Sequence, residues 1–110
     1  MKRYSPEQLE NLIDETVKKI HLLTSLKGGE YSGDIDRLAN FRRNAENLEL
    51  TMEDVWAIYA AKHWDAINQY VKDVRTKTSR LRLESISSRA DDLIVYLILL
   101  KAIINDHTSV

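Results

Sequence analysis

The stretch DDLIVYLILLKAII, residues 91–104, is the most apolar part of this 110-residue chain. Its uninterrupted apolar run, 93–100, continues past Lys101 but stays well short of the roughly 20 residues that a membrane span requires. We therefore predict a buried helix over about 85–105. A helix that is apolar on every side needs cover on every side, and three partner helices in so small a chain would leave part of it uncovered. We expect this C-terminal helix to form a subunit interface in a homo-oligomer.

Capping residues mark the start of a first helix near the N-terminus. Ser5 suits the N-cap, Pro6 stands at the first helical position, and Gln8 completes a capping box. The helix is expected to end at Gly28-Gly29, because glycine commonly terminates helices. Its apolar residues recur at helical spacing and form one stripe. They are Leu9, Leu12, Ile13, Val17, Ile20 and Leu23.

Two more helices are predicted between the first and the last. One begins at Asp34 or a near neighbour acting as its cap. Its expected packing residues are Leu38, Phe41, Ala45 and Leu48. The other opens with Thr51 and Asp54, a second capping signature, and runs to about Asp73. Its expected inward residues are Val55, Ile58, Tyr59, Ile67, Tyr70 and Val71.

Residues 74–82 lose the helical periodicity and carry four basic side chains, so we predict an exposed, mobile connector there. Apolar residues make up 44% of the chain and charged residues 30%, which is typical of a globular protein. The predicted fold class is all-α. It is a single domain over 1–110, compact and bundle-like with four helices, and oligomeric through its apolar C-terminal helix.

Composition excludes several classes of protein. With no cysteine, the chain can form neither a disulfide framework nor a thiolate metal site, and this fits a reducing compartment. The first residues lack the apolar stretch of a secretory signal. The formal charge of −1 gives no overall attraction to nucleic acid or anionic lipid. We expect a cytoplasmic protein with no membrane or nucleic-acid partner, whose electrostatic recognition is local.

The only glycine-rich stretch, 27–34, is the first candidate for a binding site. Backbone amides near a helix N-terminus favour anions, and the flanking Lys27, Tyr31 and Arg37 could bind a phosphate. The stretch matches neither a Walker pattern nor a dinucleotide fingerprint. An ordinary turn between helices is the alternative interpretation.

A second candidate lies in the third helix, where Lys62 and Asp65 are three residues apart and share a face. The alternative is a solvated surface pair, with His63 as an isolated polar residue. The chain has three widely separated histidines and no second ligand at helical spacing, so a histidine metal site is not expected.

A third candidate is the set Arg89, Asp92 and Tyr96, whose spacing places them on one face just before the fourth helix becomes wholly apolar. A partly buried aspartate needs a partner, and the sequence offers Arg89, Lys62 or a metal ion. The set is either a ligand site or an internal ion pair that orients the third and fourth helices.

Short motifs spread over about 25–105 resemble those of small phage and prophage helical proteins. The motifs are Lys27-x-x-Glu30-Tyr31, Arg37-x-x-Asn40-Phe41, Lys62-His63-x-Asp65-Ala66 and Ile86-x-x-Arg89-x-x-Asp92-Leu93-Ile94-x-Tyr96. Those proteins are in turn similar to the nucleotide-modification-associated and MazG-like all-α families. The resemblance implies a nucleotide or nucleotide-derived small molecule as ligand. It also implies the cytoplasm of an infected or lysogenic bacterial host.

The magnesium-binding pattern of MazG-like enzymes is incomplete in this chain. Their later Glu-x-x-Asp motif corresponds to Arg89-x-x-Asp92, and their Glu-Glu-x-x-Glu helix has no match after Asp14-Glu15. The resemblance therefore implies nucleotide binding without catalysis and without a cofactor. Such a protein could sequester a nucleotide immune signal of the host. Its predicted ligand-binding residues are Lys27, Tyr31, Arg37, Asn40, Arg43, Lys62, His63, Arg89, Asp92 and Tyr96.

Two other functions remain open from the sequence. One is a MazG-like magnesium-dependent nucleotide pyrophosphohydrolase that uses Asp92 with Glu10, Asp14 or Glu15. The other is a protein-binding adaptor whose basic connector, 74–82, docks an acidic partner or nucleic acid.

Overall fold

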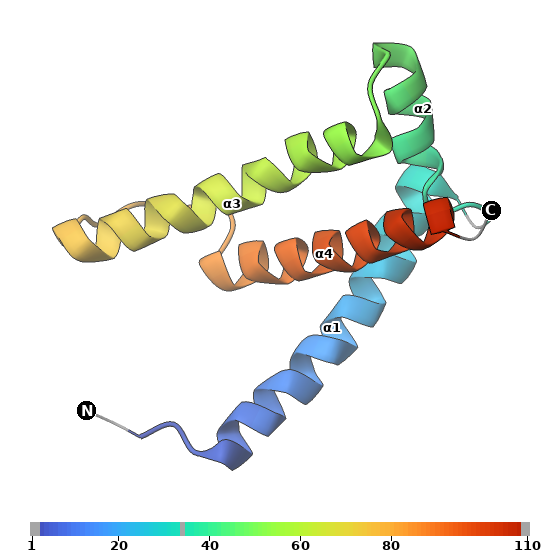
Figure 1. Cartoon of the computed structure of the whole chain (residues 1–110). Coiled ribbons are helices and arrows are strands. Elements are labelled where there is room, and N and C mark those ends of the chain that lie inside the picture. The colour runs from blue at the N-terminus through green and yellow to red at the C-terminus, as the bar shows by residue number, and fades with distance from the viewer. Residues whose placement is uncertain (1–2, 34, 109–110) are drawn as a thin grey trace.

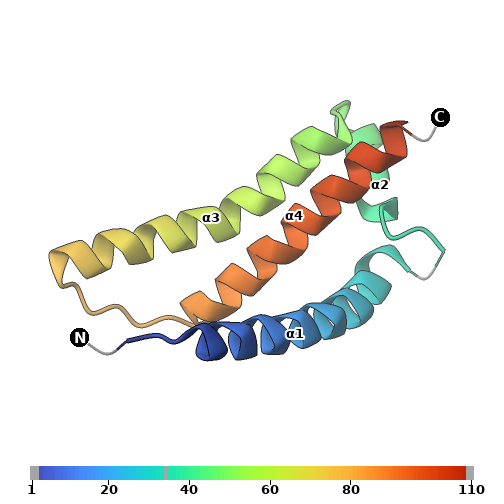
Figure 2. The same ribbon diagram turned by 60° about the horizontal axis from the view of Figure 1, so that its bottom comes forward.

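The computed structural model describes residues 3–33 and 35–108, and all regular secondary structure in these ranges is α-helical. The elements are α1 (Pro6–Ser32), α2 (Ala39–Leu48), α3 (Met52–Thr76) and α4 (Ile86–Thr108). α4 lies between α1 and α3 and contacts both (Figure 2). The short α2 packs against α3 and α1. The prediction of an all-α chain with four helices is confirmed.

The described ranges contain no helix with the length and apolarity needed to cross a membrane.

Both predicted capping boxes are confirmed. At the start of α1, the amide of Gln8 donates to Ser5 Oγ at 3.1 Å, and the amide of Ser5 donates to Gln8 Oε1 at 2.8 Å. At the start of α3, the same exchange joins Thr51 and Asp54 at 3.0 and 3.1 Å. These side chains satisfy amides that have no partner within the first helical turn.

The predicted end of the first helix at Gly28-Gly29 is wrong, because α1 continues to Ser32. A glycine in a helix interior costs only about 1 kcal/mol relative to alanine, and contacts of this last part of α1 with α2 and α4 offset that cost. The chain instead leaves the helix at Gly33, whose φ of 76° is readily available only to glycine. The Gly33 amide closes the helix by donating to the Gly29 carbonyl at 3.1 Å.

The start of α2 also differs from the prediction. The expected cap, Asp34, lies outside the described residues. α2 begins at Ala39, and its N-cap residue, Leu38, has no side chain that can accept a hydrogen bond from the helix. Two side chains from upstream take over this role. Ser32 Oγ accepts from the Asn40 amide at 3.1 Å, and Asp36 Oδ1 accepts from the Leu38 amide at 2.9 Å.

The hydrophobic core sits at one end of the molecule, where α2, the start of α3 and the end of α4 meet (Figure 1). Its buried members are Leu38, Phe41, Ala45, Met52, Val55 and Ile103. Among the expected inward residues of α3, Val55 is buried and Tyr59 and Ile67 are half-buried. The expectation is wrong for Ile58, Tyr70 and Val71, which are exposed because α2 and α4 cover only part of the circumference of α3. On α2, the expected packing residue Leu48 is also exposed.

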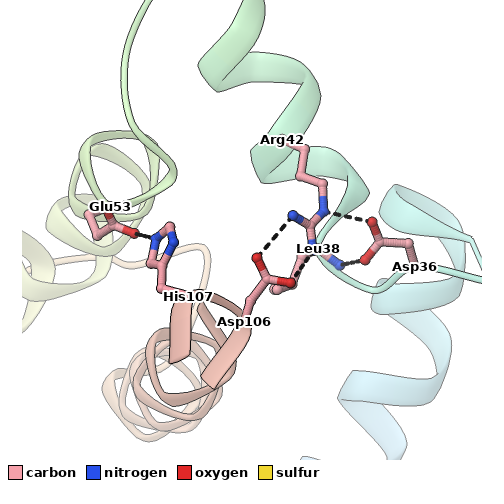
Figure 3. Close-up of polar contacts among 6 residues, drawn as sticks. All are labelled: Asp36, Leu38, Arg42, Glu53, Asp106 and His107. Carbon is pink, nitrogen blue, oxygen red and sulfur yellow. Dashed lines mark hydrogen bonds and ion pairs between the residues drawn. The ribbon is translucent and has the colours of Figure 1, made fainter. Parts of the chain in front are cut away.

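Ion pairs fasten the end of α4 to this core (Figure 3). Arg42 on α2 donates through Nη1 and Nη2 to both carboxylate oxygens of Asp106, at 3.1 and 2.7 Å, and through Nε to Asp36 at 2.8 Å. Nearby, His107 Nε2 lies 2.6 Å from Glu53 Oε1 on α3. The hydrogen bond from the Leu38 amide, followed by that from Arg42, lowers the pKa of Asp36.

The molecule is more open than the compact bundle that the sequence predicts. Its radius of gyration is 16.6 Å, against roughly 13 Å for a compact domain of this length. The N-terminal half of α1 diverges from α3 and α4 (Figure 1). The predicted apolar stripe of α1 is consequently exposed at Leu9, Leu12, Ile13 and Val17.

As expected, the other helices of a single chain leave part of α4 uncovered. Its outer face exposes four large apolar residues, because α1 and α3 cover only the opposite side. They are Ile94, Leu97, Ile98 and Ile104.

The basic segment after α3 is held by ion pairs, in contrast to the mobile connector that was predicted. Residues 74–76 belong to α3, and the connector begins at Lys77. Asp73 is only 4% exposed. Its carboxylate accepts hydrogen bonds from Arg80 Nε at 2.6 Å and from Arg82 Nη2 at 2.8 Å. Hydrogen bonds from Arg80 and then Gln69 lower the pKa of Asp73 to about 2.

Replacing Asp73 by asparagine should destabilise the protein in a pH-dependent way. The folded-state pKa of Asp73 lies below its ordinary value of 3.8, so its charge stabilises the fold above that value. The contribution is lost as pH falls toward about 2. Denaturant unfolding of Asp73→Asn and wild type should therefore differ most above about pH 5 and converge in acid. Asp65→Asn, an exposed change on the same helix, should show no such convergence.

Candidate functional site

A cavity of about 540 Å³ opens between the C-terminal half of α1, the start of α2 and the middle parts of α3 and α4. This volume lies within the range of about 300–1,000 Å³ that small-molecule sites occupy. The apolar part of its lining consists of Leu23, Phe41, Val95, Tyr96 and Leu99. The exposed ring of Tyr31 and the hydroxyl groups of Thr24, Ser25 and Ser32 also line it.

Three cationic side chains from different parts of the chain line the same cavity. Lys27 comes from α1, Arg37 from the turn before α2, and Lys62 from α3. Lys27 Nζ lies 3.5 Å from Asp92 Oδ1 on α4, and Arg37 Nη1 donates to the Thr24 carbonyl at 3.5 Å. The carboxylates of Glu84 and Asp92 also line the cavity, so cations outnumber carboxylates among its described lining residues.

A chain of polar contacts joins two carboxylates of the lining, Asp92 and Glu84, through His63 and Arg89. His63 is buried, and its Nδ1 lies 3.7 Å from Asp92 Oδ2 and 3.3 Å from Arg89 Nη1. Arginine is only a donor, so the contact with Arg89 requires Nδ1 to accept and the imidazole to be neutral. Arg89 Nη2 then pairs with Glu84 Oε2 at 3.1 Å.

Burial shifts the pKa values of His63 and Tyr96, which form the aromatic floor of the cavity. Desolvation lowers the pKa of His63, and the opposing attraction of Asp92 is smaller. The charges of Arg89 and Lys62 lower this pKa further. Burial likewise raises the pKa of the Tyr96 hydroxyl, and the neighbouring Asp92 adds to this effect. The ring of Tyr96 lies 5.4 Å from that of His63, centroid to centroid.

Most of the predicted ligand-binding residues meet at this cavity. Those that line it are Lys27, Tyr31, Arg37, Asn40, Lys62, His63, Asp92 and Tyr96. Arg89 is not part of the lining and contacts it through His63. Arg43 is exposed on α2, outside the lining, and its Nη2 lies 3.4 Å from Asn40 Oδ1.

Two of the predicted local arrangements are wrong. The stretch around Gly28-Gly29 is not a phosphate-binding loop before a helix, because it forms the last turns of α1. The C-terminal end of a helix presents carbonyl groups rather than amides, and it disfavours anions. In addition, Asp92 pairs with Lys27 instead of the expected Arg89 or Lys62, and the neutral His63 lies beside it with Nδ1 3.7 Å from Asp92 Oδ2. His63 is consequently not an isolated polar residue.

The sequence-based reasoning missed Glu84 and the pair that Lys19 forms with Asp91. Glu84 lies in the connector, where no periodicity indicates which way a side chain faces. Lys19 pairs with the buried Asp91 at 2.9 Å and so helps to hold α1 on α4. Asp91 and Asp92 immediately precede the apolar run of α4, and this position was a usable signal that both need partners.

The described residues contain no group of three or more His, Asp or Glu side chains placed to hold a metal ion. Asp92 is paired with Lys27. The other proposed ligands, Glu10, Asp14 and Glu15, belong to the N-terminal half of α1, which diverges from α4 (Figure 1). The magnesium-dependent alternative therefore has no donor set among these residues.

Comparisons of the chain with family models, curated proteins and solved structures find no match. The resemblance to phage and MazG-like proteins therefore stays a prediction, and function is argued from the geometry of the cavity.

Acidification should destabilise the protein through His63. The folded-state pKa of His63 lies below the ordinary value of 6.5, so the unfolded chain binds a proton first as pH falls. Wild type should lose stability between about pH 7.5 and 5.5, measured by denaturant unfolding. His63→Gln should lose less over the same interval. His21→Gln, an exposed change on α1, should retain the wild-type pH dependence.

Proposed function

We propose that this protein binds a nucleotide or a nucleotide-derived anion in the cavity and does not turn it over. The supporting observation is that Lys27, Arg37 and Lys62 converge on a cavity that also holds aromatic rings. Phosphate groups require cations or amide donors, and a base requires an apolar or aromatic surface. The cavity offers both within one volume of about 540 Å³.

The cationic side chains would bind the phosphates directly. A hydrogen bond to a charged group contributes about 1.5–3 kcal/mol, so three such contacts supply about half or more of the roughly 8 kcal/mol that micromolar binding requires. Arg37 can contact two phosphate oxygens at once, whereas Lys62 acts as a point charge. Both residues are exposed, so the phosphates that they bind would lie near solvent.

The aromatic and acidic residues would hold the base. The exposed ring of Tyr31 is available for stacking, which contributes about 1–3 kcal/mol per base. Carboxylates accept hydrogen bonds from exocyclic amino groups of bases. Glu84 and Asp92 are the cavity residues with this capacity.

The same cavity supports binding better than hydrolysis. Water attack on a phosphate needs charge stabilisation and an activated nucleophile, which magnesium commonly supplies. The carboxylates here are paired with basic side chains. The resemblance extends the proposal to a phage protein that sequesters a nucleotide immune signal, with the cytoplasm of the host as its location.

A thermal-shift screen with mononucleotides, nucleoside triphosphates and cyclic nucleotides, each with and without magnesium, tests the proposal. Ligand at 100 times its dissociation constant adds about 2.7 kcal/mol to stability, so Tm should rise by about 10 °C without magnesium. Arg37→Ala and Lys62→Ala should each weaken binding by about 10- to 100-fold.

Arg43→Ala is the matched control, because Arg43 is a cationic residue near the site that does not line the cavity. It should leave the shift unchanged. A shift that occurs only with magnesium, accompanied by pyrophosphate release, would favour the hydrolase instead. No shift with any nucleotide would contradict the proposal.

A further inference from the structure

The buried ring of His63 lies between two charged side chains of α4. Its Nδ1 is 3.3 Å from Arg89 Nη1 and 3.7 Å from Asp92 Oδ2. In the neutral ring this atom accepts a hydrogen bond from Arg89. In the protonated ring it can only donate, and Asp92 is then the acceptor within reach. The protonation state of His63 therefore selects between two partners.

Lys27 also stands between two partners. Its Nζ lies 3.5 Å from Asp92 Oδ1, and the same half-exposed side chain lines the cavity, where it would bind a phosphate. Asp92 is buried, so it can lose Lys27 to a ligand only if another group compensates its charge. His63 lies beside the second oxygen of the same carboxylate and can gain a positive charge.

The charged groups around His63 oppose its protonation unless an anion joins them. Among the described residues, four cations and two carboxylates line the cavity or contact His63, so a further positive charge would add to an existing excess. The Tyr96 hydroxyl stays neutral, because burial and then Asp92 raise its pKa. The charged groups are Lys27 on α1, Arg37 before α2, Lys62 on α3, Glu84 in the connector, and Arg89 and Asp92 on α4.

We propose that anion binding in the cavity is coupled to protonation of His63, with Asp92 exchanging Lys27 for His63 as its partner. The coupling rests on the proposed function and adds control of the same site by pH. Lys27 turns to the anion, and a proton from solvent binds His63 Nδ1, which donates to Asp92. Arg89 loses its contact with His63 but keeps Glu84 at 3.1 Å. Each charged group in the exchange therefore retains a partner.

A bound anion acts on the pKa of His63 in two opposing ways, and the increase should be larger. An opposite charge within about 4–6 Å shifts a pKa by about 1–3 toward the charged form. Covering the ring would lower the pKa by desolvation, but His63 is already only 8% exposed, so little water remains to be removed. Burial holds this pKa below its ordinary value of 6.5 in the free protein, and anion binding should raise it.

The affinity of the cavity for an anion should consequently increase as pH falls, because the complex binds one proton more than the separate partners. Sulfate is a suitable probe, since it carries two negative charges and does not titrate near neutral pH. A phosphate monoester has a pKa of about 6 and would obscure the effect. The sulfate dissociation constant should decrease by up to about tenfold per pH unit in wild type. In His63→Gln it should not depend on pH.

NMR of the His63 ring signals as a function of pH tests the exchange of partners directly. Sulfate should raise the pKa of His63 relative to chloride at equal ionic strength. Lys27→Gln leaves Asp92 without its cation and should raise this pKa with no added sulfate. Lys18→Gln is the matched control, because it removes the same charge from an exposed position on α1. It should leave the His63 titration unchanged. The signals of His21, which is exposed on α1, should respond to neither sulfate nor Lys27→Gln.

An unchanged His63 titration in Lys27→Gln, or an equal rise in Lys18→Gln, would overturn the exchange of partners. An unchanged titration in sulfate, or a pH-dependent sulfate affinity that persists in His63→Gln, would overturn the coupling.

The nucleotide screen separates this coupling from the proposed function. A nucleotide that raises Tm while neither sulfate nor Lys27→Gln changes the His63 titration would contradict the coupling alone. A His63 titration that responds to both, with no nucleotide raising Tm, would contradict nucleotide binding alone.

Discussion

The structure depends on two adjacent buried carboxylates at the start of α4, Asp91 and Asp92. Each is less than 10% exposed, and a buried charge is tolerated only when it is paired. Both partners come from α1: Lys19 pairs with Asp91, and Lys27 pairs with Asp92. Removing a partner from a fully buried ion pair costs about 3–5 kcal/mol, and the half-exposed lysines reduce that figure here. These pairs hold α1 on α4 and so form the wall of the cavity.

Polar attachment of α1 explains why the molecule is open. The buried apolar cluster joins α2, α3 and α4, and Arg42 with Asp106 and Asp36 reinforces the same end (Figure 3). α1 contributes no residue to that cluster. Its two ion pairs act at Lys19 and Lys27, and they leave the N-terminal half without contacts that would cover its apolar face. The cavity and the exposed stripe therefore arise from the same constraint.

The cavity combines features that usually conflict. Its floor is aromatic and desolvated enough to lower the pKa of His63 and raise that of Tyr96. The charged side chains of its lining are long and come from different elements. The proposed ligand, an amphipathic anion with a flat ring, would displace water from the floor with its ring and bind these side chains with its charge. A nucleotide has this distribution of charge and apolar surface.

Local signals in the sequence determined the helices and several of their ends. Ser5 with Gln8 and Thr51 with Asp54 form capping boxes that need only neighbours three residues away, and both were predictable for that reason. Much of the site was also predictable, since helical spacing places Asp92 and Tyr96 on one face.

Tertiary structure decided the rest. Gly28 and Gly29 stay helical because contacts elsewhere offset their intrinsic cost, and Asp92 pairs with Lys27, 65 positions away in sequence. Whether a stripe such as Leu9 to Val17 is covered depends on long-range packing, because the periodicity of a helix shows which residues share a face and does not show what that face contacts.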